Sequence, residues 1–440
     1  MLWSLVEELF PIHRTLVNDG FDRSLGILQK RLPFMKVLRY PSGMKVWDWV
    51  IPGRWNVRDA YVADSRGRRL IDFKASNLHL SAYSVPFRGE VSREVLFKHL
   101  KTLPDQPTVI PYNFLYYRKD WEFNVAHDML GAFKDSSYRV HIDVDTRPGT
   151  LKVGEAFFPG KTAQEIWISS YLCHPTMAND NVSGVAAAVG LMDRLARGPK
   201  RRYSYRLLIW PETVGPVAYL SQHEKLLSRV VGGYNVYICG DRGPLTYKAS
   251  YQGNGLADRA ARHVLRQGWP DARLKDFIPF GSDERQFNAP GVRLPIGALT
   301  RSGPGEFAGY HTSGDDLSVI SPESLSDTVE ALSRMVDTIE ADRVYKNRYR
   351  GEPCFSRHDF VVPGYHQVGN DRHKNAFRIL ANEVDGTRSL LDIAEKWGIP
   401  MDLLAPLAKE FERAGLISAA SPRCLRTKTS RIRAQRRHVQ

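Results

Sequence analysis

The sequence predicts an α/β fold in which a mostly parallel sheet is flanked by helices, and three observations predict it. Segments of strand length alternate with amphipathic segments of helix length, as in parallel sheets joined by helical crossovers. The strand segments are apolar throughout, as expected of strands buried on both faces. The composition, with 42% hydrophobic and 25% charged residues, is that of a globular protein. The strand segments are EIWISSYL at 165–172, YRLLIW at 205–210 and YNVYICG at 234–240, and the helices lie at 184–198 and 216–230.

Two regions precede these segments. Residues 1–45 carry apolar residues at helical spacing and are predicted to be the N-terminal helical part of the same domain. Residues 46–145 differ, because short alternating runs such as WNVRDAYVAD and YRVHIDV are separated by Gly, Pro and Asp. We therefore expect an inserted β-rich module at 46–145 and assign 146–350 to the α/β domain.

The last part of the chain predicts a small domain and a tail. Between 375 and 417, three helical segments separated by Gly turns lead into a short strand, which predicts a winged-helix domain at 351–420. Its third helix has mixed charge, so we expect no nucleic-acid partner. Seven Lys and Arg residues with no acid lie between Arg423 and Arg437, which predicts a basic, flexible tail at 421–440.

Charge and cysteine usage exclude several classes of protein. About half of the formal net charge of +14 belongs to the tail, so the body of the protein is only mildly basic. No apolar run approaches the roughly 18 residues of a membrane span. Glu7 and Glu8 interrupt what would be the core of a signal peptide. The four cysteines form no CxxC pair, which argues against thiolate zinc and disulfide frameworks. We expect a cytoplasmic protein without a membrane partner.

Candidate site residues follow the predicted strands directly. In open α/β sheets, ligands bind beyond the carboxyl ends of the strands. His174 and Asp180 follow the first strand segment, Glu212 follows the second and Asp241 the third, and His311 lies in a later loop. Taken singly, each has a structural alternative as a loop, cap or turn residue. Together, imidazoles and carboxylates at one sheet edge suit Zn²⁺ better than Ca²⁺ or Mg²⁺.

Four motifs resemble the site motifs of the zinc aminopeptidases of clan MH: HPTMANDNVSG, WPETVG, GSDERQF and YHTSGDD. More closely, SNLHLSAYSVP and HLKTLPDQPTVIPY resemble aminopeptidase-like proteins encoded with bacterial polysaccharide and natural-product genes. The resemblance implies a peptidase-type domain, an inserted module and a winged helix. It implies that His174 binds one metal, that Asp180 bridges two metals or holds one, and that His311 and Asp241 are further ligands. Glu212 falls on the general base.

The chain departs from that family pattern at one position. The dizinc enzymes carry two adjacent glutamates, and the second is a ligand, whereas Thr213 follows Glu212 here. Because Thr is a poor zinc ligand, we expect one tight zinc site, with a second site as the alternative.

These features predict a zinc-dependent, aminopeptidase-like hydrolase of an amide or peptide bond, acting on a peptide or a small-molecule or saccharide intermediate. Acids such as Glu284 or Glu306 would hold a free amine. Two alternatives stay open: a single-zinc cyclisation enzyme of the glutaminyl-cyclase type, and a non-catalytic binding protein with a decayed site. A homo-oligomer also stays open.

Overall fold

A computed structural model of the chain describes residues 2–360 and 371–420. It divides into two compact units, Met1–Asp258 with Asp271–Ser333, and Arg259–Pro270 with Arg334–Gln440. The predicted basic tail at 421–440 lies outside the described residues. The predicted domain boundaries stay a prediction. None of the described helices has the length and apolar character needed to cross a membrane.

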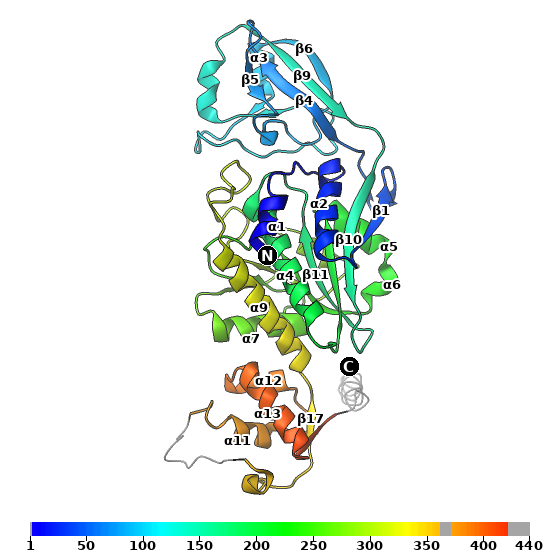
Figure 1. The fold of residues 1–440 in the computed structure, drawn as a ribbon, viewed down its shortest axis with the longest axis vertical. Coiled ribbons are helices and arrows are strands. Elements are labelled where there is room, and N and C mark those ends of the chain that lie inside the picture. The colour runs from blue at the N-terminus through cyan, green and yellow to red at the C-terminus, as the bar shows by residue number, and fades with distance from the viewer. Residues whose placement is uncertain (1, 361–370, 421–440) are drawn as a thin grey trace, which may run out of the picture. The chain divides into compact units, whose positions relative to one another are not determined.

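The larger unit is organised around one mixed eight-stranded sheet (Figure 1). Its four central strands are parallel, which confirms the predicted fold class. Antiparallel strands extend it at both sides. In order across the sheet, the strands are β1 (Lys36–Pro41), β10 (Thr150–Phe158), β12 (Ser204–Trp210), β11 (Glu165–Tyr171), β13 (Val230–Val236), β16 (Ile296–Thr300), β14 (Thr246–Lys248) and β15 (Arg273–Lys275).

The antiparallel strands have a simple physical cause. A parallel return needs a crossover of a dozen or more residues. Residues 159–164 between β10 and β11 are too few for one, so the chain reverses, and β10 pairs antiparallel with β12. The predicted N-terminal helical part also differs in detail, because it holds two helices and then strand β1.

Helices cover both faces of the sheet. The strand β11 is fully buried, and its Trp167 packs in one cluster with Val217 and Ala218 of α5. Helix α4, rich in small buried residues, contacts β11, β12 and β13. The helices that lie in this unit or begin in it are α1 (Leu2–Leu9), α2 (Asp19–Arg31), α4 (Gly184–Arg197), α5 (Val214–Gln222), α6 (Glu224–Leu227), α7 (Leu256–Gly268), α8 (Glu284–Phe287) and α9 (Pro322–Ala341).

The β-rich region within the larger unit has its own antiparallel sheet and core. The strand order is β5 (Arg69–Asp72), β4 (Asn56–Ala63), β9 (Ser137–Asp145) and β6 (Phe87–Ser92). Trp55 and Trp121 pack in its apolar cluster, so these aromatic residues serve the core. Its other elements are α3 (Arg93–Lys98), β7 (Leu100–Lys101), β8 (Phe123–Asn124), and the 3₁₀ turns Asn77–His79 and His127–Ala132. The hairpin of β2 (Lys45–Val46) and β3 (Trp49–Val50) instead packs Val46 into the core of the central sheet.

The smaller unit contains the predicted helix order. Its helices α11 (Ala376–Glu383), α12 (Leu390–Trp397) and α13 (Met401–Arg413) follow a 3₁₀ turn at Phe355–His358. Ser389 closes a capping box at the start of α12, and Gly398 ends that helix at φ 65°, a conformation that favours glycine. Strand β18 (Ile417–Ala419) pairs antiparallel with β17 (Tyr345–Asn347), which precedes all three helices.

A buried ion pair in the central sheet generates a stability prediction. Arg206 on β12 donates to both oxygens of Glu165 at 2.8 and 2.9 Å and to Glu155 at 2.5 Å. Arg206→Met leaves these two carboxylates without their cation and should lower the free energy of unfolding by about 3–5 kcal/mol. The control Arg194→Met removes an exposed pair with Glu330 and should cost less than about 1 kcal/mol. Urea unfolding measures both, and equal losses would contradict the assignment.

Candidate metal centre

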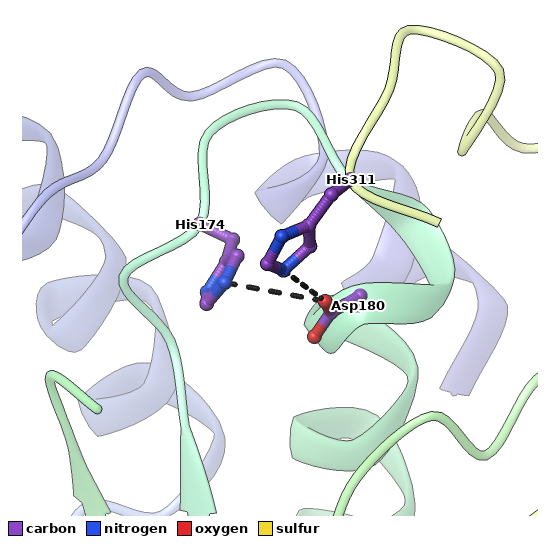
Figure 2. Close-up of side chains that lie close together, drawn as sticks. All are labelled: His174, Asp180 and His311. Atoms are coloured by element: carbon purple, nitrogen blue, oxygen red, sulfur yellow. Dashed lines mark ion pairs between the residues drawn. The ribbon is translucent and has the colours of Figure 1, made fainter. Parts of the chain in front are cut away.

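Three side chains from separate segments meet beyond the ends of the central strands: His174, Asp180 and His311. His174 follows β11, Asp180 lies in an irregular turn at Ala178–Ser183 before α4, and His311 lies in the loop between β16 and α9. One potential ligand atom from each lies within 4.8 Å of the others. Figure 2 shows both imidazoles directed toward the carboxylate, with His311 Nε2 at 3.1 Å and His174 Nε2 at 4.0 Å from Asp180 Oδ2.

The protonation states of Asp180 and His174 suit a cation at this position. Burial would raise the pKa of Asp180, but His174, His311 and the Tyr171 hydroxyl outweigh it and hold the pKa at about 2. Burial lowers the pKa of His174 to about 4, so its imidazole is neutral. For His311, burial alone would lower the pKa, but contact with Asp180 and the charges of nearby acids raise it. A neutral imidazole and an ionised carboxylate are ligands that divalent metals require.

An unsatisfied buried oxygen is the direct test of whether a metal fits here. The Tyr171 hydroxyl donates to Asp180 Oδ1. Among the residues that the structure describes, none supplies a hydrogen bond of normal geometry to Asp180 Oδ2, although it is fully buried. Buried carboxylate oxygens without a partner are costly. The residues therefore fit a bound cation, with two nitrogens and one oxygen as ligands.

The turn that carries Asp180 is fixed by amide side chains and by Asp315. The two oxygens of Asp315 accept the N–H groups of Asn179 at 2.7 Å and Asp180 at 2.8 Å. Asn181 Oδ1 accepts the N–H of Ile238 at 3.0 Å, which ties the turn to the end of β13. A Cβ at Gly184 would lie 2.6 Å from the Tyr237 backbone, so only glycine fits. Burial raises the pKa of Asp315 to about 8.

The backbone around the group adopts unfavourable conformations. Thr176, Thr213, Ile238 and His311 all have positive φ, between 42° and 63°. Three of the four residues, Thr176, Thr213 and Ile238, are β-branched and rarely tolerate that region. Such conformations persist where the surrounding structure enforces them, and they concentrate at functional sites.

Glu212 lies beside the group, and its side chain is partly exposed. Its Oε2 lies 3.8 Å from His174 Nε2, and Ser282 donates to its Oε1 at 2.7 Å. Its N–H donates to Cys173 Sγ at 3.2 Å. Burial and the charge of Asp180 raise the pKa of Glu212 to about 7, against the opposing effect of Ser282 and Arg285. A carboxylate with this pKa can both accept and return a proton near neutral pH.

The structure does not bring Asp241 into the metal-binding group. Its carboxylate accepts hydrogen bonds from Asn179 Nδ2 at 2.8 Å, the Gly243 N–H at 2.6 Å and the Ser302 hydroxyl at 2.8 Å. These contacts explain its position without a metal. As a further ligand, Asp241 therefore stays a prediction.

Two groups at the site were not found by sequence reasoning. Arg14 is fully buried, and its guanidinium donates to the carbonyl oxygens of Leu9 and His174, the latter at 2.9 Å. Tyr112, from the β-rich region, places its ring centroid 5.2 Å from that of His174 and 5.4 Å from that of His311. No strand end or motif marks Arg14, and Tyr112 ends the quoted segment HLKTLPDQPTVIPY without any site role having been assigned to it.

Residues 110–112 also hold the His311 loop. The Tyr112 N–H donates to the His311 carbonyl at 2.8 Å, and the Ser313 N–H donates to the Ile110 carbonyl at 2.8 Å. Ser313 Oγ accepts from the Ile110 N–H at 3.0 Å. The β-rich region thus pairs with the loop that carries one of the candidate ligands.

Comparison with known proteins gives two family matches and a close relative. A family described as "Domain of unknown function (DUF4910)" matches residues 3–342, and "winged helix-turn-helix" matches residues 343–419. A Clostridium acetobutylicum protein named "Putative polysaccharide biosynthesis protein with aminopeptidase-like domain" is 36% identical, covering 94% of this chain and 95% of the relative.

Solved structures agree with these matches. The crystal structure of a "putative peptidase" from Clostridium acetobutylicum has a TM-score of 0.89 at 36% identity, covering 95% of this chain and 96% of that one. BSAP, a zinc aminopeptidase from Bacillus subtilis, has a TM-score of 0.57 at 16% identity, covering 76% and 92%. A peptidase M28 precursor from Shewanella amazonensis has 0.56 at 15%, covering 77% and 92%. At these lower identities the likeness is one of fold.

The Asp315 contacts predict a stability difference between adjacent acids. Asp315→Asn keeps the shape but replaces one acceptor oxygen with an NH₂ group that faces a backbone N–H. We expect the free energy of unfolding to fall by about 1–3 kcal/mol. Asp316→Asn is the control, because Asp316 is exposed and its side chain bonds only Ser318 among the described residues. Thermal or urea unfolding compares the two variants, and an unchanged Asp315→Asn would refute the role of Asp315.

Proposed function

Because the chain belongs to the DUF4910 family of aminopeptidase-like proteins with a C-terminal winged helix, we propose that it is a zinc-dependent hydrolase of an amide bond. The observation that carries the proposal is the group of His174, Asp180 and His311, the first two buried, with Glu212 Oε2 at 3.8 Å from His174 Nε2. A metal-binding group beside a carboxylate with a pKa of about 7 is suited to hydrolysis.

His174, Asp180 and His311 would hold the zinc ion. Two histidines and one carboxylate, with a coordination position left for water or substrate, are the ligand set of several catalytic zinc sites. When bound, zinc supplies Lewis acidity, which polarises a carbonyl group and makes water a stronger acid. Thr213 in place of a second glutamate, and the engaged carboxylate of Asp241, favour one zinc ion over two.

Glu212 would move the proton. Ser282 fixes Oε1, so Oε2, on the side of His174, is the oxygen that accepts the proton of the attacking water. The same oxygen then returns that proton to the departing nitrogen, which leaves as a neutral amine. The raised pKa of Glu212 fits both steps, because the group is readily ionised and readily protonated near neutral pH.

The proposed substrate is a peptide or small molecule with an amide bond. The name of the Clostridium acetobutylicum relative refers to polysaccharide biosynthesis, and that favours an amide-bearing intermediate of saccharide metabolism.

Turnover of an amide library in water labelled with heavy oxygen tests the reaction type. Hydrolysis incorporates the label into the acid product, whereas cyclisation does not.

The mechanism predicts that Glu212→Gln keeps zinc and loses activity. Glutamine has a similar shape but cannot accept the proton, so kcat should fall about 10²–10⁴-fold. Glu330→Gln, an exposed acid on α9, is the matched control and should leave kcat unchanged. Turnover and zinc content are measured on the same samples. Full turnover by Glu212→Gln would refute the general base, and loss of zinc would instead make Glu212 a ligand.

The ligand assignment predicts the metal content of three variants. The purified protein should contain about one zinc per chain, and His174→Ala and His311→Ala should each lose it, because the two remaining ligands bind zinc weakly. Asp241→Asn should keep it, since the Asp241 carboxylate is bonded elsewhere. Elemental analysis decides. Zinc retained by both alanine variants would overturn the site, and zinc lost from Asp241→Asn would add a ligand to it.

A further inference from the structure

The acids expected to hold a free amine are engaged in other contacts. Glu284 is fully buried, and its carboxylate accepts from Lys248, from Asn235 at 3.0 Å and from Tyr237 at 3.3 Å. Glu306 is paired with Arg273 at 3.1 Å and with Lys275 at 2.8 Å. Neither carboxylate is left to receive an ammonium group, so that expectation from the sequence is not supported.

The other acids near Glu212 are engaged in the same way. Asp283 is fully buried and accepts from Trp210 Nε1 at 2.9 Å and from the Thr213 N–H at 2.7 Å. Asp241 and Asp315 hold backbone and amide groups, as described above. An aminopeptidase needs an anionic partner for the amine of its substrate, and these acids do not offer one.

A cation occupies the neighbourhood instead. Arg285 lies on α8 and is half-buried. Its Nε donates to the Ser282 carbonyl at 2.9 Å, and its Nη2 lies 3.4 Å from Thr213 Oγ1. Ser282 donates a hydrogen bond to Glu212, and Thr213 follows Glu212 in the sequence. Burial raises the pKa of both Glu212 and Tyr310, and the charge of Arg285 opposes that rise in both, as expected of a guanidinium close to both.

Arg285 has spare donors and no acidic partner. In the part of the chain that the structure describes, no carboxylate lies within 4.0 Å of its guanidinium. Arginine has five N–H donors, and these two contacts leave most of them unused.

We propose that the substrate carries an anionic oxygen group, a carboxylate or a phosphate, close to the scissile carbonyl, and that Arg285 binds this group. The proposal rests on the proposed amide hydrolysis and specifies the class of amide. Bidentate contacts of a guanidinium with a carboxylate or phosphate give both affinity and orientation. A substrate with a free amine at the same position would meet a like charge instead of a partner. The site then selects acidic acyl groups over aminoacyl groups.

Four short amides of similar length test the proposal by binding. Succinamate, 3-phosphonopropanamide, butanamide and β-alaninamide differ mainly in the group at the end distant from the amide: carboxylate, phosphonate, methyl or ammonium. Titration calorimetry or ligand-observed NMR on the zinc-loaded full chain should rank one or both anions above butanamide and β-alaninamide last. Arg285→Gln should weaken binding of the preferred anion about 10–100-fold, the range for losing a charge-assisted hydrogen bond. Whichever of the two anions binds more tightly identifies the natural group as a carboxylate or a phosphate.

Variants separate a binding role from a structural one. Arg285→Lys keeps the charge and should recover part of the affinity, whereas Arg285→Glu should shift preference toward β-alaninamide. Arg293→Gln is the control for non-specific attraction, because the Arg293 guanidinium stacks on Tyr251, 3.4 Å from the ring centroid. If Arg285→Gln unfolds, the Lys and Glu variants still report the preference. Equal binding of the charged and neutral probes, no measurable binding of either anion, or tighter binding of β-alaninamide by the unmodified protein would overturn the proposal.

Hydrolysis distinguishes this inference from the proposed function. The 4-nitroanilides of succinate, butyrate and β-alanine release a coloured product, and kcat/KM should be highest for the succinyl compound if the carboxylate is preferred. Cleavage of all three at equal rates keeps the hydrolase and removes the role of Arg285. Anion-selective binding without cleavage of any amide keeps the role of Arg285 and removes the hydrolase.

Discussion

The ionised carboxylate of Asp180, buried beyond the ends of the parallel strands, is the constraint on which the rest of the site depends. Removing such a charge from water is unfavourable unless nearby groups compensate for it. One oxygen has a hydroxyl donor, Tyr171, and the other faces His311 and His174. The second oxygen still lacks a hydrogen bond of normal geometry from the described residues. The fold therefore holds a buried negative charge that the two imidazoles compensate only in part.

The surrounding elements can be understood as support for that buried charge. Asp315 and the amides of Asn179 and Asn181 fix the turn, because their side-chain oxygens all accept backbone N–H groups. Arg14 donates to the His174 carbonyl and holds it in place. The left-handed backbone at Thr213 and His311 adds strain that only a well-packed surrounding structure could maintain. Rigidity at the metal-binding group is thus distributed over segments far apart in the sequence.

Sequence reasoning reached the central features because they follow a general rule of open sheets. The positions directly after β11 and β12 predicted His174 and Glu212, and the structure places them 3.8 Å apart. Sequence reasoning could not show which acids already have hydrogen-bond or ion-pair partners, since the partners of Asp241, Glu284 and Glu306 come from distant segments. Arg14 carries no local signal, because a buried cation looks ordinary until the chain is folded. Tyr112 ends the quoted segment HLKTLPDQPTVIPY, but only the fold shows that its ring lies beside both histidines. The antiparallel strand β10 was missed for a related reason, since its direction depends on a connection too short for a helix.

The pairing of residues 110–112 with the His311 loop has a consequence for how such proteins diversify. A segment that lies only on the surface of a domain can be replaced or lost during evolution without affecting the functional site of that domain. Here residues 110–112 form backbone hydrogen bonds with the loop of a candidate ligand, and the Tyr112 ring lies beside both histidines. The two parts have become mutually dependent. Substitutions at residues 110–112 would therefore appear in a genetic screen as defects of the candidate metal centre, and transfer of that centre to another scaffold would require these residues as well.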